Sequence, residues 1–352
     1  MPRPPKILFL ANWPRTQRSA GNYAFFAHWS SRPRIRFFGS FSLGPWTRLE
    51  QKWFKFYVVQ PLVALFRAPF YDAVIAYSSQ CGLPLAALLR LCFWMRTKLL
   101  VFDVESFGRV RAGWKLGLIR FASRRIDHLL YASRAQEKYY DEVLPQMKSR
   151  RTFIPLGIGP YVKRRDERAG ENGPLLALGQ HGHEFRDWAT LLSAYALINS
   201  PVDLMIVGRD SIPEADRAGV PIPEGVKLVP YQPMERLQDY VEQARCVILP
   251  LPEREQSLGQ LTLLFAMAMG KAVVAARIIG LTDYLTDGLT GMFYEPGNAA
   301  DLARCLRRLL DDPARALRLG REARRQVESR FTDQQLGRTW EDIFYRVTGL
   351  PR

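Results

Sequence analysis

The strongest constraint on the fold lies in residues 256–270, which stand between two short apolar runs at 246–251 and 272–276. Each run has the length and aliphatic composition of a strand that is buried on both faces of a parallel sheet. Residues 260–269 are predicted to form a helix that ends at Gly270. The order strand, loop, helix, strand is the building unit of a doubly wound α/β fold.

The turn that leads into this helix predicts a binding function. Its glycine, Gly259, lacks a side chain that would hold a ligand away from the backbone, and Thr262 places a hydroxyl in the first helical turn. A helix that begins at the carboxyl end of a parallel strand directs backbone N–H groups and the positive end of its dipole toward that point. We therefore expect phosphate to bind there.

The chain is basic, and its charge is unevenly distributed. It has 50 Lys and Arg against 34 Asp and Glu, a formal net charge of +16. Residues 1–165 hold 28 basic and 8 acidic side chains, whereas residues 166–352 hold 22 and 26. The basic half favours an anionic partner. Nucleic acid, an anionic membrane surface and a phosphorylated substrate would each fit. A solvated basic face would give the same pattern.

Cysteine spacing and hydropathy indicate the compartment. The 4 cysteines are far apart and form no C-x-x-C pair, which favours a reducing compartment and argues against structural zinc. Residues 7–12 are expected to form a strand rather than the core of a signal peptide. The apolar stretches 54–70 and 82–95 are interrupted by Lys or Arg, so neither is expected to span a membrane.

Strands and helices alternate through the first half. Strands are expected at 7–12, 71–77, 98–102 and 127–131, and helices at 48–67, at 84–95 and from the capping box Ser133-x-x-Gln136. Gly21 follows the first strand and is assigned to ligand binding, because a glycine at such a crossing allows close approach to the backbone. A glycine required only for packing would look the same.

Two regions of the first half have residues suited to anionic partners. The aromatic segment 48–67 contains Lys52 and Lys55, and the basic segment 109–125 contains Arg109 and Arg111. We assign these four residues to contact with an acceptor or a membrane. A buried position in the core accounts equally well for the aromatic segment, because Pro61 interrupts its helical pattern.

Carboxylates follow the strand at 98–102. Asp103 and Glu105 stand where open α/β sheets hold ligands, just beyond the carboxyl end of a strand. Alternatively, they cap a helix or pair with Arg109 and Arg111.

The second half reads as another doubly wound unit. Strands are expected at 175–178, 202–207, 226–229, 246–251 and 272–276, and helices at 188–198, 234–244, 260–269 and 299–310 and from Asp312-Pro313 onward. A last amphipathic helix covers 331–349.

This half resembles the donor-binding domain of the retaining glycosyltransferases with the GT-B fold, the large family-4 group, or glycosyltransferase group 1. The resemblance rests on residues 259–274, 287–291, 294–297, 301–303 and 319–324. It implies an α/β fold of two doubly wound, Rossmann-like domains that face a central cleft. Residues 1–165 would bind the acceptor, residues 166–331 would bind the nucleotide sugar, and the helix in 332–352 is expected to cross back to the first domain.

The resemblance also implies where the donor binds. Its diphosphate would rest on the helix start formed by Ser257, Leu258, Gly259, Gln260, Leu261 and Thr262. Arg186 stands where the family commonly has a lysine that contacts the phosphates, and Gln180 where it often has an arginine. Tyr231 is assigned to stack on the base of the donor, although a core tyrosine would fit the same pattern.

The sequence departs from the family at its acidic residues. The family usually has two glutamates eight positions apart, and Ser257 and Phe265 occupy these places here. Glu255, or Glu253, would replace the first glutamate if the loop is reset, and the second has no replacement. Asp103 or Glu105 takes the place of a histidine in the first domain. We therefore predict Glu255 and Asp103 as catalytic residues.

The leading hypothesis is a retaining hexosyltransferase that needs no metal ion and no cofactor beyond its nucleotide sugar. The acceptor would be a saccharide or a polyprenyl-diphosphate-linked saccharide, and the protein would be cytoplasmic, either free or at the inner face of the cytoplasmic membrane. The alternative is a non-catalytic GT-B-fold protein that recruits a partner or lipid. Nucleic-acid binding is disfavoured because the sequence contains no recognised nucleic-acid module.

Overall fold

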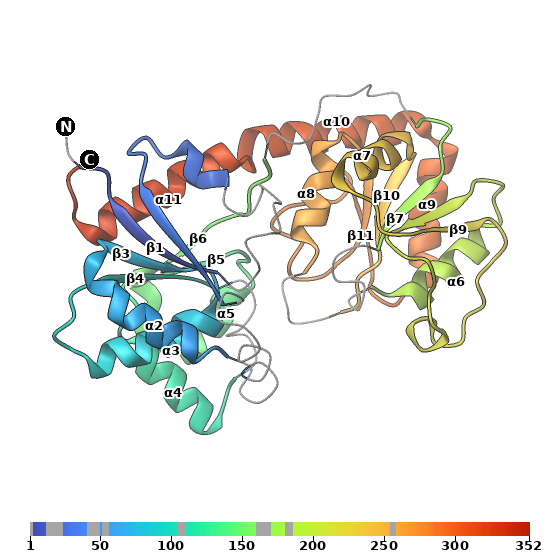
Figure 1. The fold of residues 1–352 in the computed structure, drawn as a ribbon. Helices are drawn as coiled ribbons and strands as arrows, with labels where there is room; N and C mark the ends of the chain where they lie inside the picture. Colours follow the sequence, from blue (N-terminus) through green and yellow to red (C-terminus); the bar gives the residue numbers. More distant parts are fainter. Residues whose placement is uncertain are drawn as a thin grey trace. The chain divides into compact units, whose positions relative to one another are not determined.

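The computed structural model describes residues 3–11, 24–40, 50, 56–103, 110–159, 170–179, 186–253 and 258–352. The chain divides into two compact units (Figure 1). The first contains Met1–Pro155 and Asp333–Arg352, and the second contains Leu156–Thr332. Each unit holds one six-stranded sheet in which all the pairings are parallel.

The sheet of the first unit has the order β2-β1-β3-β4-β5-β6. Its strands are β1 (Lys6–Ala11), β2 (Arg34–Gly39), β3 (Ala73–Ala76), β4 (Lys98–Asp103), β5 (His128–Tyr131) and β6 (Arg151–Phe153). The central strands β1, β3, β4 and β5 are almost fully buried, as their aliphatic composition predicts. The edge strand β2 was not predicted from the sequence, because its exposed arginines hide the strand pattern.

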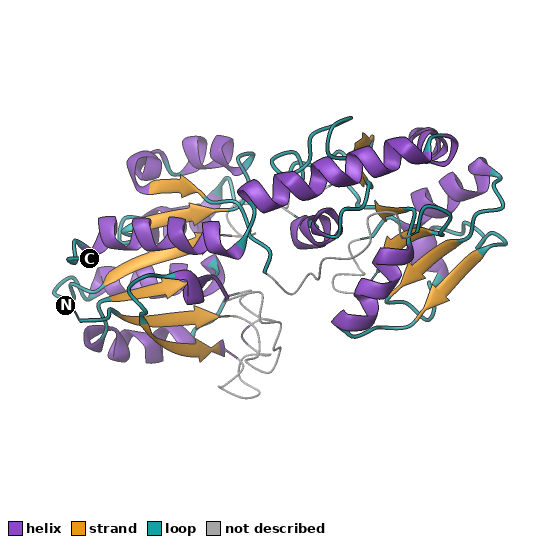
Figure 2. Ribbon diagram, turned by 90° about the horizontal axis from the view of Figure 1, so that it is seen from above, coloured by secondary structure: helices purple, strands orange, loops and turns teal. Residues whose placement is uncertain are grey.

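Helices cover both faces of this sheet, as Figures 1 and 2 show. The helices α2 (Val59–Arg67), α3 (Ser79–Leu91), α4 (Gly113–Ser123) and α5 (Gln136–Val143) pack on one hydrophobic cluster. The 3-10 helix η2 (Ala24–His28) and the last helix α11 (Asp333–Thr348) contact each other and cover the opposite face. Right-handed crossovers explain this division, because the chain steps from β1 to β2 in one direction and from β3 to β6 in the other.

The predicted helix over 48–67 was wrong in its extent. Residues 56–58 are not helical, and α2 begins at Val59. Pro61 explains the start, because proline is tolerated in the first turn of a helix, where N–H groups have no intrahelical partner. The carboxylate of Glu50 accepts hydrogen bonds from the N–H groups of Val58 and Val59 at 3.0 and 2.9 Å, so it satisfies the exposed start of α2.

The predicted helix over 84–95 was displaced. The helix α3 begins at Ser79, with the Ser78 hydroxyl accepting from the Gln80 N–H, and ends at Leu91. Pro84 lies inside it. Since proline has no N–H, the Gln80 carbonyl lacks its intrahelical donor, and the Tyr57 N–H takes that place at 3.1 Å.

The helix α11 is anchored in the first unit by an aromatic cluster. The Trp340 indole is fully buried, stacks on Phe25 at a centroid distance of 5.6 Å and meets the edge of Phe102 at 5.8 Å. Glu341 accepts hydrogen bonds from the backbone N–H groups of Ser30 and Ser31, both at 2.9 Å. The end of the chain therefore completes the first unit.

Asp333, the first residue of α11, carries a pH-dependent penalty. It is 2% exposed, its carboxylate oxygens have no hydrogen-bond partner among the described residues, and burial raises its pKa to about 6. The penalty is absent below the pKa of an unfolded aspartate, about 3.9, grows between this pH and about 6, and is complete above it. We expect Asp333→Asn to raise the free energy of unfolding by about 2 kcal/mol at pH 8, and by much less near pH 4.5.

Urea unfolding at both pH values tests this expectation. Asp342→Asn is the matched control, because Asp342 lies on the same helix with its side chain 56% exposed. An equal effect of Asp333→Asn at the two pH values would contradict the assignment.

The sheet of the second unit has the order β12-β11-β10-β7-β8-β9. Its strands are β7 (Leu175–Leu178), β8 (Leu204–Val207), β9 (Val226–Val229), β10 (Cys246–Leu249), β11 (Val273–Ala276) and β12 (Met292–Tyr294). The main helices are α6 (Trp188–Ile198), α7 (Met234–Gln243), α8 (Gln260–Ala268), α9 (Ala299–Asp311) and α10 (Pro313–Arg330). Within the described ranges, no helix is both long and apolar enough to cross a bilayer.

The strand order creates a switch point between β7 and β10. From β7 the chain moves outward through β8 to β9, and it then returns to β10 and moves outward in the other direction to β12. The helices that follow β7 and β10 therefore lie on opposite faces of the sheet, where α6 packs on α9 and α8 packs on α10. Open α/β sheets bind ligands at the carboxyl end of such a switch point.

Candidate donor-binding site

The start of α8 lies directly beyond the carboxyl end of β10. Gly259 precedes the helix with φ of 82°, the left-handed region that side chains other than glycine rarely adopt. A Cβ atom on Gly259 would come within 2.6 Å of Leu251 Cδ1. The conformation therefore favours glycine, and a larger residue would also displace the Leu251 side chain, which agrees with the predicted turn that lacks bulk.

The first turn of α8 presents its backbone to this point. The Leu263 N–H donates to the Gly259 carbonyl at 2.8 Å and closes the first helical turn. The N–H groups of Leu261 and Thr262, which precede it, have no acceptor within a helix of this geometry. Gln260 is buried, Leu261 is 44% exposed, and Thr262 and Leu258 are half-buried. This turn can therefore meet a phosphate with backbone amides.

Arg186 lies beside the neighbouring strand. Its guanidinium is fixed by donation from Nε to the Leu178 carbonyl, at the last residue of β7, at 2.9 Å, and the residue is only 8% exposed. The N–H of the next residue, Asp187, donates to the Pro250 carbonyl just after β10 at 2.9 Å. This hydrogen bond ties the Arg186 segment to the strand that leads to α8.

Asp187 fixes the other side of the same segment. Its carboxylate accepts from the Thr190 N–H at 3.0 Å and from the Thr190 hydroxyl at 2.6 Å, so it caps α6. Sequence analysis predicted no role for Asp187, although an aspartate three residues before a threonine at a helix start is a capping signal. Arg186 thus lies at the end of β7, and α8 begins after the neighbouring strand β10, at the same edge of the sheet.

No role was predicted for Gly179 from the sequence either. Its N–H donates to the Val207 carbonyl at 2.7 Å, and a Cβ atom there would meet Arg209 Cγ at 2.9 Å and the Trp188 ring at 3.0 Å. The signal available in the sequence was a glycine directly after a buried strand. Gly179 lets the segment after β7 pass close to its neighbours.

Tyr231 lies further along the same sheet. It follows β9, which is separated from β7 by β8, and its side chain is 62% exposed. An exposed ring beyond a strand end is available for stacking on a base. Its contact with the donor stays a prediction.

Asp103 lies in the first unit, at the end of β4. It is fully buried, and Oδ2 accepts from the Tyr140 hydroxyl at 2.7 Å. Burial and the nearby Asp103 carboxylate raise the pKa of Tyr140 well above its usual range. Tyr140 thus stays a hydrogen-bond donor, and the arrangement offers Asp103 a structural role beside the predicted catalytic one.

Arg111 was assigned to the acceptor or to a membrane. Its guanidinium is exposed and lies 3.2 Å from Glu142 Oε2. The remaining predicted positions, Gly21, Lys52, Lys55, Arg109, Gln180, Glu255 and Ser257, lie outside the described residues. Their assignments stay predictions.

Phe265, which replaces the second glutamate of the family, is 5% exposed within α8. Glu253, one of the two proposed substitutes for the first glutamate, is exposed after β10. Across the described part of the chain, no group of His, Cys, Asp and Glu side chains converges as a metal site requires.

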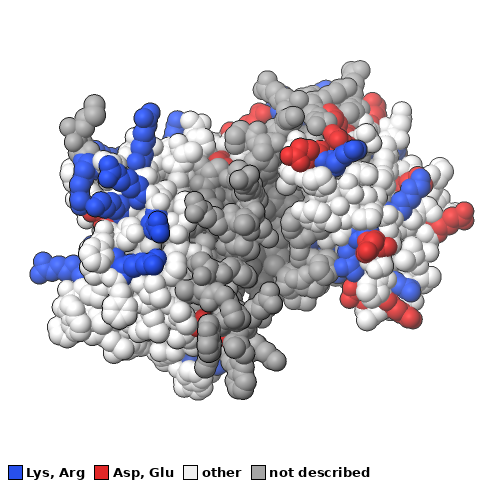
Figure 3. Space-filling model, viewed as in Figure 1, with Lys and Arg blue, Asp and Glu red and all other residues white. Residues whose placement is uncertain are grey.

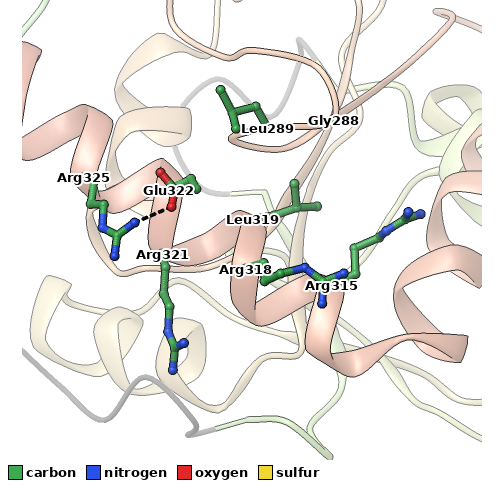
Figure 4. A pocket seen from close by; sticks show the side chains of 8 residues that line it. All are labelled: Gly288, Leu289, Arg315, Arg318, Leu319, Arg321, Glu322 and Arg325. Carbon is green, nitrogen blue, oxygen red and sulfur yellow. Dashed lines mark hydrogen bonds and ion pairs between the residues drawn. The ribbon is translucent and has the colours of Figure 1, made fainter.

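A separate pocket of about 400 Å³ lies between the turn at Gly288 and α10 (Figure 4). Its arginines are engaged with carboxylates, because Arg325 pairs with Glu322, and Arg318 lies 3.4 Å from Asp312. None of the predicted donor residues lines it. The pocket is therefore distinct from the edge formed by β7, β10 and α8.

Comparison with known proteins decides the family of the second unit. Residues 174–312 match the family model described as Glycosyl transferases group 1. This part of the chain belongs to that family. The matched range contains β7, Arg186, β10 and the start of α8, so the edge described above lies within the group 1 domain.

Curated relatives match part of the chain. The phosphatidyl-myo-inositol mannosyltransferase of Propionibacterium freudenreichii is 29% identical over 59% of this chain and 55% of its own length. The D-inositol 3-phosphate glycosyltransferase of Streptomyces avermitilis is 36% identical over 30% of this chain and 22% of its own length. The chain thus spans from about a fifth to about half of these relatives' length.

Solved structures establish the fold. HepE of Anabaena, solved in complex with UDP, superposes with a TM-score of 0.74 at 15% identity, covering 97% of this chain and 100% of that one. The sucrose-phosphate synthase of Thermosynechococcus elongatus gives 0.74 at 19% identity, covering 99% and 100%. The two units together therefore have the GT-B fold, and the group 1 match lies within the second unit.

Proposed function

We propose that the protein is a glycosyltransferase that moves a sugar from a nucleoside diphosphate sugar to a saccharide or lipid-linked acceptor. The observation that carries the proposal is the shared edge of the neighbouring strands β7 and β10 within the group 1 match, where Arg186 bonds the end of β7 and α8 begins after β10. In this proposal the second unit binds the donor and the first unit binds the acceptor.

The chemistry needed at this edge is stabilisation of the leaving nucleoside diphosphate. As the bond from the anomeric carbon to the phosphate oxygen breaks, negative charge grows on the diphosphate. The backbone N–H groups of Leu261 and Thr262 and the Arg186 guanidinium would bear that charge. Backbone amides and an arginine can stabilise this negative charge without a metal ion. We therefore propose a metal-independent reaction that needs no cofactor.

The stereochemical part of the proposal follows from the same groups. Transfer with retention, by attack on the face that the leaving group vacates, depends more on leaving-group stabilisation than on a strong base. This suits a chain in which Phe265 stands where the family has a glutamate. Asp103 and Glu255 remain the proposed carboxylates for the acceptor side.

Two comparisons guide the choice of substrates. HepE was solved with UDP and with UDP-glucose, so uridine nucleotides are the first donors to test. The Propionibacterium relative is a phosphatidyl-myo-inositol mannosyltransferase, and the basic first half of this chain likewise suits an anionic, lipid-linked acceptor. Such an acceptor places the enzyme at the cytoplasmic face of a membrane.

A test is the release of nucleoside diphosphate from UDP-, GDP- and ADP-sugars, measured with lipid-linked saccharide acceptors. Arg186→Ala should lower kcat/KM about 10- to 100-fold, because a charge-assisted hydrogen bond contributes about 1.5–3 kcal/mol. Arg308→Ala, an exposed arginine on α9, is the control and should leave the rate unchanged. Equal rates for Arg186→Ala and the wild type would remove Arg186 from the donor site.

The second candidate function is a non-catalytic GT-B protein that binds a partner or lipid. The buried Phe265 in place of the family's glutamate favours it. The two candidates differ in turnover, because the enzyme releases nucleotide in proportion to time and enzyme concentration, whereas the binding protein does not.

A further inference from the structure

The exposed aromatic side chains of the described residues gather in the first unit. Phe66, Phe70, Phe93, Trp94 and Trp114 are each between 67% and 83% exposed. The large apolar side chains that the described part of the second unit exposes are Leu, Ile, Met and one Tyr, each between 36% and 62% exposed, and they include neither Phe nor Trp. Leaving such rings in water is unfavourable by roughly 25 cal/mol per Å² of apolar area, so this gathering calls for a partner that covers it.

The exposed rings follow helical periodicity. Leu62, Phe66 and Phe70 recur every fourth residue along α2 and the following turn, on the side opposite the buried Ala64 and Leu65. On α4, Trp114 and Leu118 stand in the same relation and are 73% and 44% exposed. Each helix therefore has one apolar stripe in the core and a second one in solvent.

The helices that bear these stripes form one layer. The helix α3 packs against both α2 and α4, and Figure 1 shows α2, α3 and α4 on the same side of the sheet. The Thr97 hydroxyl donates to the Ala68 carbonyl at 3.0 Å and ties the loop after α3, with Phe93 and Trp94, to the end of α2. The Arg90 guanidinium lies 4.6 Å from the centroid of the Phe121 ring and links α3 to α4.

We call this surface the aromatic layer, and define it by the exposed residues Leu62, Phe66, Phe70, Leu91, Phe93, Trp94, Trp114 and Leu118. Leu91 ends α3 and is 64% exposed. The layer consists of the outward sides of packed helices.

The helices and turns of the aromatic layer carry basic side chains and no acidic ones, although Asp127 pairs with Lys98 and Arg125, and Glu142 pairs with Arg111. Residues 56–71, 73–98 and 110–126 contain no Asp or Glu, and their basic residues are Arg67, Arg90, Arg96, Lys98, Arg111, Lys115, Arg120, Arg124 and Arg125. The acidic residue between the first two segments, Asp72, is engaged with Arg3 at 2.6 Å, and its side chain is 11% exposed. In Figure 3, blue predominates over red on the first unit, mainly above the part where Figure 1 draws α2, α3 and α4, whereas both signs mix on the second unit.

We propose that the aromatic layer docks on an anionic lipid bilayer, with the rings in the interfacial region and the Arg and Lys side chains at the lipid headgroups. Trp and Phe partition into that region, and each basic residue near an anionic surface adds about 1 kcal/mol. A surface of exposed rings and leucines on the outward sides of packed helices fits a planar interface. It does not fit nucleic acid, which stacks its bases on rings within a groove.

This inference rests on the proposed function. An enzyme with a lipid-linked acceptor must reach that acceptor at a membrane, and the aromatic layer would hold it there. The binding itself is independent of catalysis. It predicts attachment to vesicles without any donor or acceptor present.

The test is co-sedimentation of the full chain with vesicles of phosphatidylcholine containing 30% phosphatidylglycerol, and with pure phosphatidylcholine vesicles. We expect sedimentation with the anionic vesicles, weakening in 0.5 M NaCl, and a blue shift of tryptophan emission. The double variant Phe93→Ser/Trp94→Ser should bind at least about tenfold more weakly, because each aromatic side chain has about 150–250 Å² to bury. Leu197→Ser/Leu289→Ser removes exposed apolar side chains from the second unit and should sediment like the wild type.

UDP titration of the double variant separates the two proposals. Unchanged nucleotide binding with lost vesicle binding supports docking by the aromatic layer and shows a folded protein. Equal sedimentation of the double variant and the wild type would overturn the inference, and so would preference for a single-stranded oligonucleotide over the vesicles. Vesicle binding by a chain that binds no nucleotide would leave the docking surface standing and refute the donor site.

Discussion

Gly259→Trp is expected to abolish nucleotide binding, with a loss of affinity above about 100-fold, because it removes at least two amide–phosphate hydrogen bonds of about 1.5–3 kcal/mol each. Gly259 has φ of 82°, which tryptophan adopts only under strain, and the new Cβ would meet Leu251 Cδ1 at 2.6 Å. The backbone is strained and the Leu251 side chain must move, and we expect the indole to stand at the N-terminus of α8, where the diphosphate is proposed to lie.

Gly219→Ala separates this effect from backbone strain. Gly219 also has a positive φ, 76°, but a Cβ atom there meets nothing within 4 Å. The alanine should lower the stability of the second unit by about 1 kcal/mol and leave nucleotide affinity unchanged. Isothermal titration with UDP, together with thermal unfolding of each variant, checks both. Retention of wild-type affinity by Gly259→Trp would remove the start of α8 from the donor site.

Trp340→Ala is expected to destabilise the first unit by about 3–5 kcal/mol, the usual cost of removing a large buried aromatic side chain. Trp340 is fully buried and contacts Phe25, Tyr77 and Phe102 at centroid distances of 5.6, 6.5 and 5.8 Å. Removing the indole empties the space between α11 and the sheet. The last helix then loses its main apolar contact with the first unit.

The matched control is Arg338→Ala, on the exposed side of the same helix, which should change stability by less than about 0.5 kcal/mol. Trp340→Phe should have an intermediate effect. Urea unfolding followed by near-ultraviolet circular dichroism measures the packing of the aromatic cluster directly. A loss below about 1 kcal/mol for Trp340→Ala would show that α11 is held elsewhere, for instance by Glu341 on Ser30.

The buried elements of the fold were the predictable ones. The bounds of β7, β9 and α6 are those expected from the sequence, because aliphatic runs and a capping aspartate act locally. The start of α2 and the start of α3 depended on how the chain accommodates Pro61 and Pro84, which involves partners outside each helix, Glu50 for α2 and Tyr57 for α3. The division between the units lies at Pro155, ten residues before the expected boundary, and the chain returns to the first unit at Asp333.

The candidate site divides in the same way. The turn at Gly259 could be predicted from the sequence, because the strand, the glycine and the helix follow one another along the chain. The hydrogen bond from the Asp187 N–H to the Pro250 carbonyl ties the Arg186 segment to β10. It could not be predicted from the sequence, because it depends on β7 and β10 being neighbours in the sheet. The burial of Asp103 under Tyr140 is likewise a tertiary contact, across 37 positions of the chain.

The most direct test of the central claim, that the group 1 domain binds a nucleoside diphosphate at the start of α8, is isothermal titration of the full chain with UDP and with GDP. We predict that one of them binds at a single site, that Arg186→Ala weakens it about 10- to 100-fold, and that Gly259→Trp removes it. A nucleotide that binds the wild type and both variants equally would contradict the account, and so would failure of UDP, GDP and ADP alike to bind the wild type.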